Sequence, residues 1–90
     1  MTIGQSLEVS DRHGKALAAY LHLPSKSDDY AATSREAGPG LVVDFAADGR
    51  PIGIEIVSPS IVTLDAVNQV LASLNQQTIG EEELAPLLAG

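Results

Sequence analysis

The sequence predicts an α+β fold: an antiparallel β-meander of four to five strands, followed by one main C-terminal helix and a short second helix. Residues 6–57 contain several runs in which apolar and polar residues alternate, as they do in half-buried strands. Residues 63–76 instead space their apolar residues along one helical face. Because the strand patterns precede the helical ones, α+β is favoured over an alternating α/β fold. We expect one domain over residues 1–90, with the sheet in 6–57 and the helical part in 63–89.

The first two strands are expected at residues 6–10 and 15–23, joined by a turn at 11–14 that contains Asp and Gly. Pro24 ends the second strand, and a weaker strand pattern follows at 30–36. Side chains of the second strand should alternate between two faces of the sheet. One face receives Leu17, Ala19, Leu21 and Leu23, and the other receives Ala18, Tyr20 and His22.

The clearest pattern is a hairpin over residues 41–57, with an Asp-Gly pair in its turn. A two-residue turn would place Val43 opposite Ile54, whereas a four-residue loop would place Val43 opposite Ile52. Both registers put the apolar residues of the two strands on the same face, which a three-residue loop would not do. Gly53, inside the second strand, indicates a bulge or a close approach of another part of the chain.

The C-terminal part has the signals of two helices. Thr63 is a suitable N-cap for the helix in 63–76, and Asp65 suits the positive end of that helix. Glu81–Glu83 suit the first turn of the second helix. Pro86 is expected to break or bend this second helix, because proline lacks a backbone donor.

The composition argues against several classes of protein. The chain has 12 acidic and 5 basic residues and a net charge of −7, which disfavours nucleic-acid binding. It has no cysteine, and therefore no disulfide and no thiolate chemistry. Neither a signal peptide nor a membrane span is expected, and the expected location is the cytoplasm.

Apolar residues remain on the sheet face that the main helix is not expected to cover. Val42, Val57 and Tyr20 are the residues that we expect at an interface on this face. A chain of 90 residues also has a thin core, so that association with further copies would add to its stability. We therefore expect a homodimer or a higher homo-oligomer, with a further protein partner as a possibility.

Asp44 and Glu55 are the most notable candidates for chemistry, because alternation places both on the face opposite the apolar stripe. With a two-residue turn they are diagonal neighbours, about 7–8 Å apart at Cα. Together with His22, they are weak candidates for binding a divalent cation or for acid–base work. The simpler interpretation is that they are ordinary polar positions of the sheet, paired with Arg50 or Arg35.

The hairpin resembles a small bacterial family catalogued as domain of unknown function 2283. The resemblance lies in Val42–Phe45 and in Asp48–Ile56, with its Gly-Ile-Glu-Ile strand. Ala18–Leu21 and Arg35–Glu36 are similar to earlier strands of that family, and the resemblance covers roughly residues 10–60. It implies a small α+β meander that forms oligomers, and it implies no reaction.

Three functions follow from these observations as hypotheses. The first is a non-catalytic homo-oligomeric interaction module, which needs no cofactor. The second is a small metal-binding or metal-assisted hydrolytic protein that uses the carboxylates of the sheet face. The third is a small-ligand sensor with a pocket between helix and sheet. The sequence identifies neither a substrate nor the partner.

Overall fold

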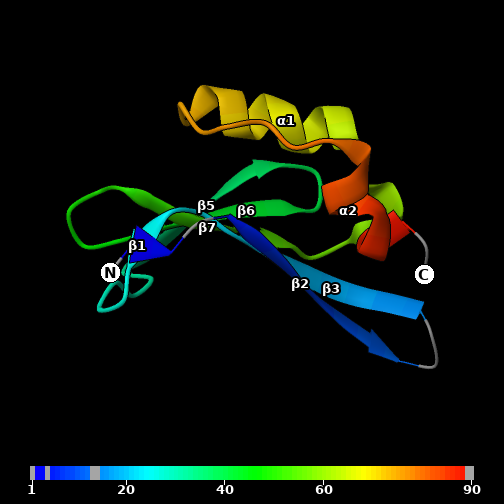
Figure 1. Ribbon diagram of the computed structural model, residues 1–90, viewed down its shortest axis with the longest axis horizontal. Coiled ribbons are helices and arrows are strands. Elements are labelled where there is room, and N and C mark those ends of the chain that lie inside the picture. The colour runs from blue at the N-terminus through cyan, green and yellow to red at the C-terminus, as the bar shows by residue number, and fades with distance from the viewer. Residues whose placement is uncertain (1, 4, 13–14, 89–90) are drawn as a thin grey trace.

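The computed structural model describes residues 2–3, 5–12 and 15–88. Its strands are β1 (Thr2–Ile3), β2 (Ser6–Arg12), β3 (Lys15–His22), β4 (Ser25–Lys26), β5 (Thr33–Gly38), β6 (Leu41–Phe45) and β7 (Pro51–Ile56). Its helices are the 3₁₀ turn η1 (Pro59–Ile61), α1 (Leu64–Ser73) and α2 (Glu81–Leu88). Five of the strands form one antiparallel sheet, in the order β2-β3-β7-β6-β5, and β1 pairs with β4 (Figure 1). The α+β fold predicted from the sequence is confirmed.

The strand order departs from a simple meander at one point. β3 lies beside β7 rather than beside β5, so the chain from residue 23 to 32 crosses to the far edge of the sheet. The central strands are the apolar ones, whereas nearly every residue of β5 is exposed. This order buries the aliphatic strands on both sides of β7 and leaves the polar strand β5 at the edge, where Arg35 and Glu36 discourage pairing with another sheet.

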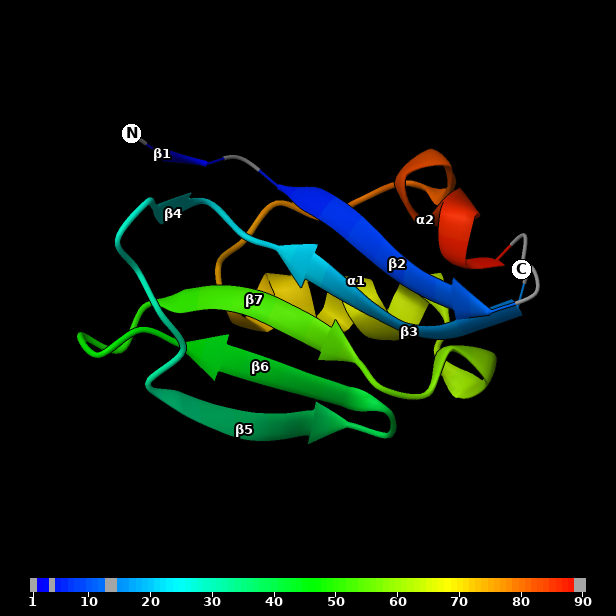
Figure 2. The same cartoon turned by 90° about the horizontal axis from the view of Figure 1, so that it is seen from below.

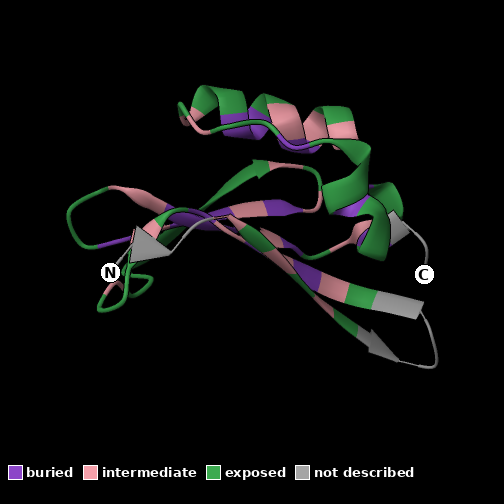
Figure 3. Ribbon diagram, viewed as in Figure 1, coloured by how far each residue is buried: buried purple, intermediate pink, exposed green. Residues whose placement is uncertain are grey.

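The core lies between the sheet and the helices, which occupy one side of it (Figures 1 and 3). Leu21 and Ile54 from the sheet, Leu71 from α1 and Leu84 from α2 are among its fully buried residues. Leu21, Ile54 and Leu71 belong to the apolar stripes predicted from the sequence. In Figure 2 the sheet is seen from its other side, with α1 behind it. We call that side the helix-free face.

The β6–β7 hairpin has the strand register predicted for a two-residue turn, but its loop is longer than two residues. Val43 lies opposite Ile54, as expected for a two-residue turn. However, Phe45 lies opposite Pro51, so that Ile52 is an extra residue in β7 and forms a bulge. The loop is longer than two residues, and it is closed by a hydrogen bond from Ala46 N to Arg50 O at 2.8 Å. The bulge keeps the apolar residues on one face although the loop is longer.

Other local expectations are corrected in detail. Asp11 and Arg12 belong to strand β2 rather than to a turn, after a bulge that follows Ser10. The remaining residues of that expected turn, 13–14, lie outside the described residues. The strand expected at 30–36 begins and ends later than expected, as β5 at Thr33–Gly38.

The helices follow their predicted start signals. Thr63 caps α1, because its hydroxyl accepts a hydrogen bond from Ala66 N at 3.1 Å. The helix ends at Ser73, earlier than expected, and Asn75 then takes a positive φ of 58°. The expected break at Pro86 is not found, since α2 continues to Leu88. Pro86 is exposed in the second half of a short helix, where the carbonyl that loses its partner can be hydrated.

Candidate functional site

A polar network lies on the helix-free face, where four strands contribute one side chain each. The register places Tyr20 of β3 beside Glu55 of β7, and Ser34 of β5 beside Asp44 of β6. All four side chains point to the same side, because residues that are direct partners across antiparallel strands share a face. We call Tyr20, Ser34, Asp44 and Glu55 the carboxylate network.

Asp44 is the centre of this network and is only 6% exposed. Its Oδ2 accepts a hydrogen bond from the Tyr20 hydroxyl at 3.1 Å, and its Oδ1 accepts one from the Ser34 hydroxyl at 2.6 Å. Within the described side chains, no buried nitrogen or oxygen atom lacks a hydrogen-bond partner. A buried carboxylate is costly unless it is hydrogen-bonded, and here the two hydroxyls supply that stabilisation.

Glu55 approaches Asp44 across the β6–β7 ladder, in the diagonal arrangement expected from the sequence. A hydrogen bond between the two side chains raises the pKa of Glu55, and burial and the charge of Asp44 add to this effect. Burial, followed by the charge of Asp44, also raises the pKa of the Tyr20 hydroxyl, which therefore stays a donor. The structure brings Asp44 and Glu55 together, and this contact raises the pKa of Glu55.

Gly53 makes room for the tyrosine of the network. A Cβ atom at this position would lie well under 3.0 Å from the hydroxyl and two ring carbons of Tyr20, closer than Cβ atoms approach other heavy atoms. The glycine within a strand thus marks a close approach, as predicted, and the group that approaches is the Tyr20 ring. Gly53 lies opposite Asp44 in β6, so the ring reaches Asp44 across the space that a side chain would fill.

His22 does not join the two carboxylates. Its Nε2 contacts the Glu8 carboxylate of β2, and its ring packs edge-on against Tyr20 with a centroid distance of 4.7 Å. The described residues contain no group of three or more His, Cys, Asp or Glu side chains arranged to hold a metal ion. The three sequence candidates therefore separate into an Asp44–Glu55 pair and a Glu8–His22 pair, with Tyr20 between them.

The arginines expected to pair with these carboxylates have other partners. Arg50 binds both oxygens of Asp29, at 2.7 and 3.1 Å, and its Nε donates to Asp48 at 2.7 Å. These hydrogen bonds lower the pKa of Asp29 and of Asp48. Arg35 lies over the Phe45 ring, 5.0 Å from its centroid. Pairing of Arg50 or Arg35 with the network, as the sequence analysis considered, is therefore not found.

The expected interface residues lie on the helix-free face around the network. Val42 is half-buried beside Glu55, and Val57 is 51% exposed just after β7. A shallow hollow of about 210 Å³ lies between Tyr20, Val57 and the alanine at position 18. Ser34 and Glu8 complete the polar contacts of this face, and sequence reasoning missed both. Strand register is the only signal that would have found them.

Residues 18–60 match the profile of a family described as "Protein of unknown function (DUF2283)". The match confirms the resemblance seen in the hairpin, and it includes all four residues of the carboxylate network as well as Gly53 and His22. Comparisons with curated proteins and with solved structures gave no match. No helix in the described part of the chain is long and apolar enough to cross a membrane.

Proposed function

We propose that this protein is a cytoplasmic, non-catalytic interaction module that forms homo-oligomers, with the helix-free face as the contact between copies. The observation that carries the proposal is that both helices lie on one side of a five-stranded sheet. The opposite side is therefore covered by neither helix, and Val57 on it is 51% exposed, whereas Tyr20 and Val42 are half-buried. Aromatic residues with a polar end, such as Tyr20, are frequent at the centres of protein interfaces.

Edge-to-edge pairing through β5 is less suitable, because Arg35 and Glu36 stand in the middle of that strand. Contact through the face is therefore favoured over extension of the sheet.

The carboxylates of this face do not prevent such a contact. Asp44 is held by two hydroxyl donors, and Glu8 contacts His22. Each of these acidic groups thus has a partner in its own chain, and a second copy need not supply one. The hollow beside Tyr20 offers a place for a side chain of the second copy.

The test is the mass of the protein in solution, measured by light scattering at micromolar concentration. Wild type should be a dimer or larger, and Val57→Glu should raise the dissociation constant at least about tenfold. Ile61→Glu is the matched control, because Ile61 is 59% exposed but lies in the 3₁₀ turn η1 rather than on the sheet. A monomeric wild type, or equal dissociation by the two variants, would reject the proposal.

The metal-assisted alternative receives less support from the geometry. The approach of Asp44 to Glu55 favours it, since paired carboxylates are common ligands of divalent cations. However, both oxygens of Asp44 already accept hydrogen bonds from hydroxyl groups, and His22 is turned to Glu8. A metal ion would have to replace these contacts, so we favour the interaction module.

A further inference from the structure

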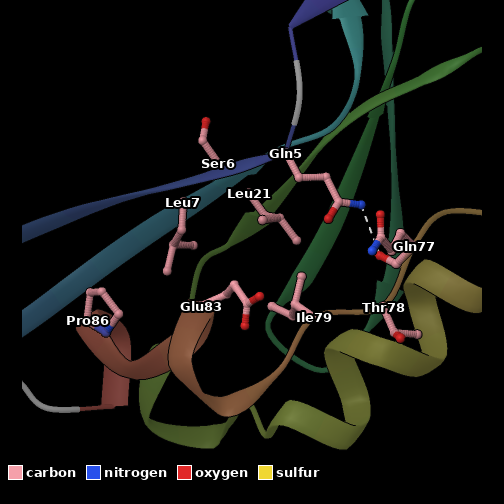
Figure 4. Close-up of a pocket in the computed structure, with 9 residues that line it drawn as sticks. All are labelled: Gln5, Ser6, Leu7, Leu21, Gln77, Thr78, Ile79, Glu83 and Pro86. Atoms are coloured by element: carbon pink, nitrogen blue, oxygen red, sulfur yellow. Dashed lines mark hydrogen bonds between the residues drawn. The ribbon is translucent and has the colours of Figure 1, made fainter.

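A cavity of about 330 Å³ lies on the other side of the sheet, at the junction of the β2 end of the sheet with the helices (Figure 4). Its sheet wall includes Leu7 of β2 and Leu21 of β3, and its helical wall includes Ile79 and Glu83. Figure 4 shows the side chains of these two walls directed toward one another. The volume equals about ten water molecules of liquid, which suits a ligand of about ten non-hydrogen atoms or fewer.

The walls of the cavity are held in place by hydrogen bonds. Asn68 of α1 fixes the segment before α2, since its side chain bonds both Ile79 O at 2.9 Å and Ile79 N at 2.8 Å. Gln5 donates to Gln77 O at 2.9 Å, which connects the start of the sheet to the same segment. The cavity is therefore formed before any ligand arrives, and binding need not pay the cost of ordering these groups.

The charge on the described lining of the cavity is negative only. Among the described residues that line it, Glu83 is the one charged side chain, and none is a lysine, arginine or histidine. One oxygen of Glu83, Oε2, accepts a hydrogen bond from Gly80 N at 2.9 Å, which fixes the carboxylate at the start of α2. No donor in the described part of the chain bonds its other oxygen. A net charge of −7 further raises the local concentration of cations and lowers that of anions.

We propose that this cavity binds a small aliphatic primary amine, with its ammonium group at the Glu83 carboxylate and its chain against Leu7, Leu21 and Ile79. An ammonium group forms charge-assisted hydrogen bonds with a carboxylate, and these are stronger than neutral ones. Neutral polar residues line part of the cavity, and the apolar residues among its described lining are aliphatic or proline. Such apolar residues, with no aromatic side chain among them, suit a flexible hydrocarbon chain rather than a flat ring. The site is separate from the helix-free face, so it does not depend on self-association.

The test uses three compounds with the same hydrocarbon chain: n-hexylamine, 1-hexanol and hexanoate. Their binding is followed by the NMR shifts of the methyl groups of Leu7, Leu21 and Ile79. Hexylamine should bind with a dissociation constant on the order of millimolar, and hexanol and hexanoate at least about tenfold more weakly. Equal shifts with all three compounds, or no shifts with hexylamine up to about 20 mM, would overturn the proposal.

Two variants locate the charge that selects the amine. Glu83→Gln should weaken hexylamine binding about tenfold and leave hexanol binding unchanged, and glutamine can still accept the Gly80 hydrogen bond. Glu81→Gln removes the same charge from the same helical turn outside the cavity, and it should bind hexylamine like wild type. Equal weakening by both variants would overturn the proposal, because it would indicate a general charge effect. If Glu83→Gln does not fold, the comparison of the three compounds on wild type still tests whether the cavity prefers the amine.

Discussion

Replacement of Gly53 by alanine is the sharpest test of the carboxylate network. The added methyl group would occupy the space of the Tyr20 ring, so the ring must move away from Asp44. Overpacking of this kind costs about 1–3 kcal/mol, and loss of a hydrogen bond to a charged group costs about 1.5–3 kcal/mol. Because the ring relieves the clash by giving up the bond, the cost is that of the lost hydrogen bond, and we expect Gly53→Ala to lower the free energy of unfolding by about 1.5–3 kcal/mol.

The assay is urea denaturation followed by circular dichroism, carried out as a double-mutant cycle with Tyr20→Ala. In the absence of the ring, the methyl group meets no obstacle, and Gly53→Ala should cost less than about 0.5 kcal/mol in that background. If Gly53→Ala alone does not fold, the double variant should fold and thereby show the rescue. An equal cost in both backgrounds would refute the argument, because the loss would then not depend on Tyr20.

Two further predictions concern the pH dependence and the core. The pKa of Glu55 is raised in the folded state, so folding takes up a proton there, and stability falls as pH rises through the interval just above the ordinary value of 4.5. Relative to Glu55→Gln, wild type should therefore lose stability in urea denaturation as the pH rises above about 4.5, and parallel curves for the two proteins would contradict this. In the core, Ile54→Ala should cost about 2–5 kcal/mol, because Ile54 is fully buried, whereas Ile61→Ala should cost less than about 0.5 kcal/mol, since Ile61 is 59% exposed. Thermal unfolding of the two alanine variants compares these costs directly, and similar shifts would show that Ile54 is not part of the core.

Parts of the candidate site follow from the sequence by local rules. Alternation along each strand places Asp44 and Glu55 on the face opposite the isoleucines, and a glycine between two isoleucines indicates a close approach. The partners do not follow from such rules. Ser34 and Glu8 join the face because β5 and β2 pair with β6 and β3, and the sequence separation of these contacts is too large for a local pattern to specify.

The ion-pair partner of Arg50 also does not follow from local sequence rules. Its position next to the hairpin made pairing with the nearby carboxylates plausible, but the crossing segment between β4 and β5 brings Asp29 to it instead. A charged side chain pairs with whichever carboxylate the chain brings within reach, and this depends on the path of the backbone. His22 is similar, since the register of β2 against β3 gives it Glu8 as a neighbour.

By itself, the sequence determined most of the residues that face the core and the approximate positions of the main strands and helices, because side-chain periodicity and capping are properties of neighbouring residues. Tertiary structure alone decided that β3 pairs with β7, that Tyr20 reaches Asp44 over Gly53, and that a cavity remains beside Glu83. Several strands of similar pattern can pair in more than one order. The order that forms buries the aliphatic residues of β3, β6 and β7 and gives the buried carboxylate its donors.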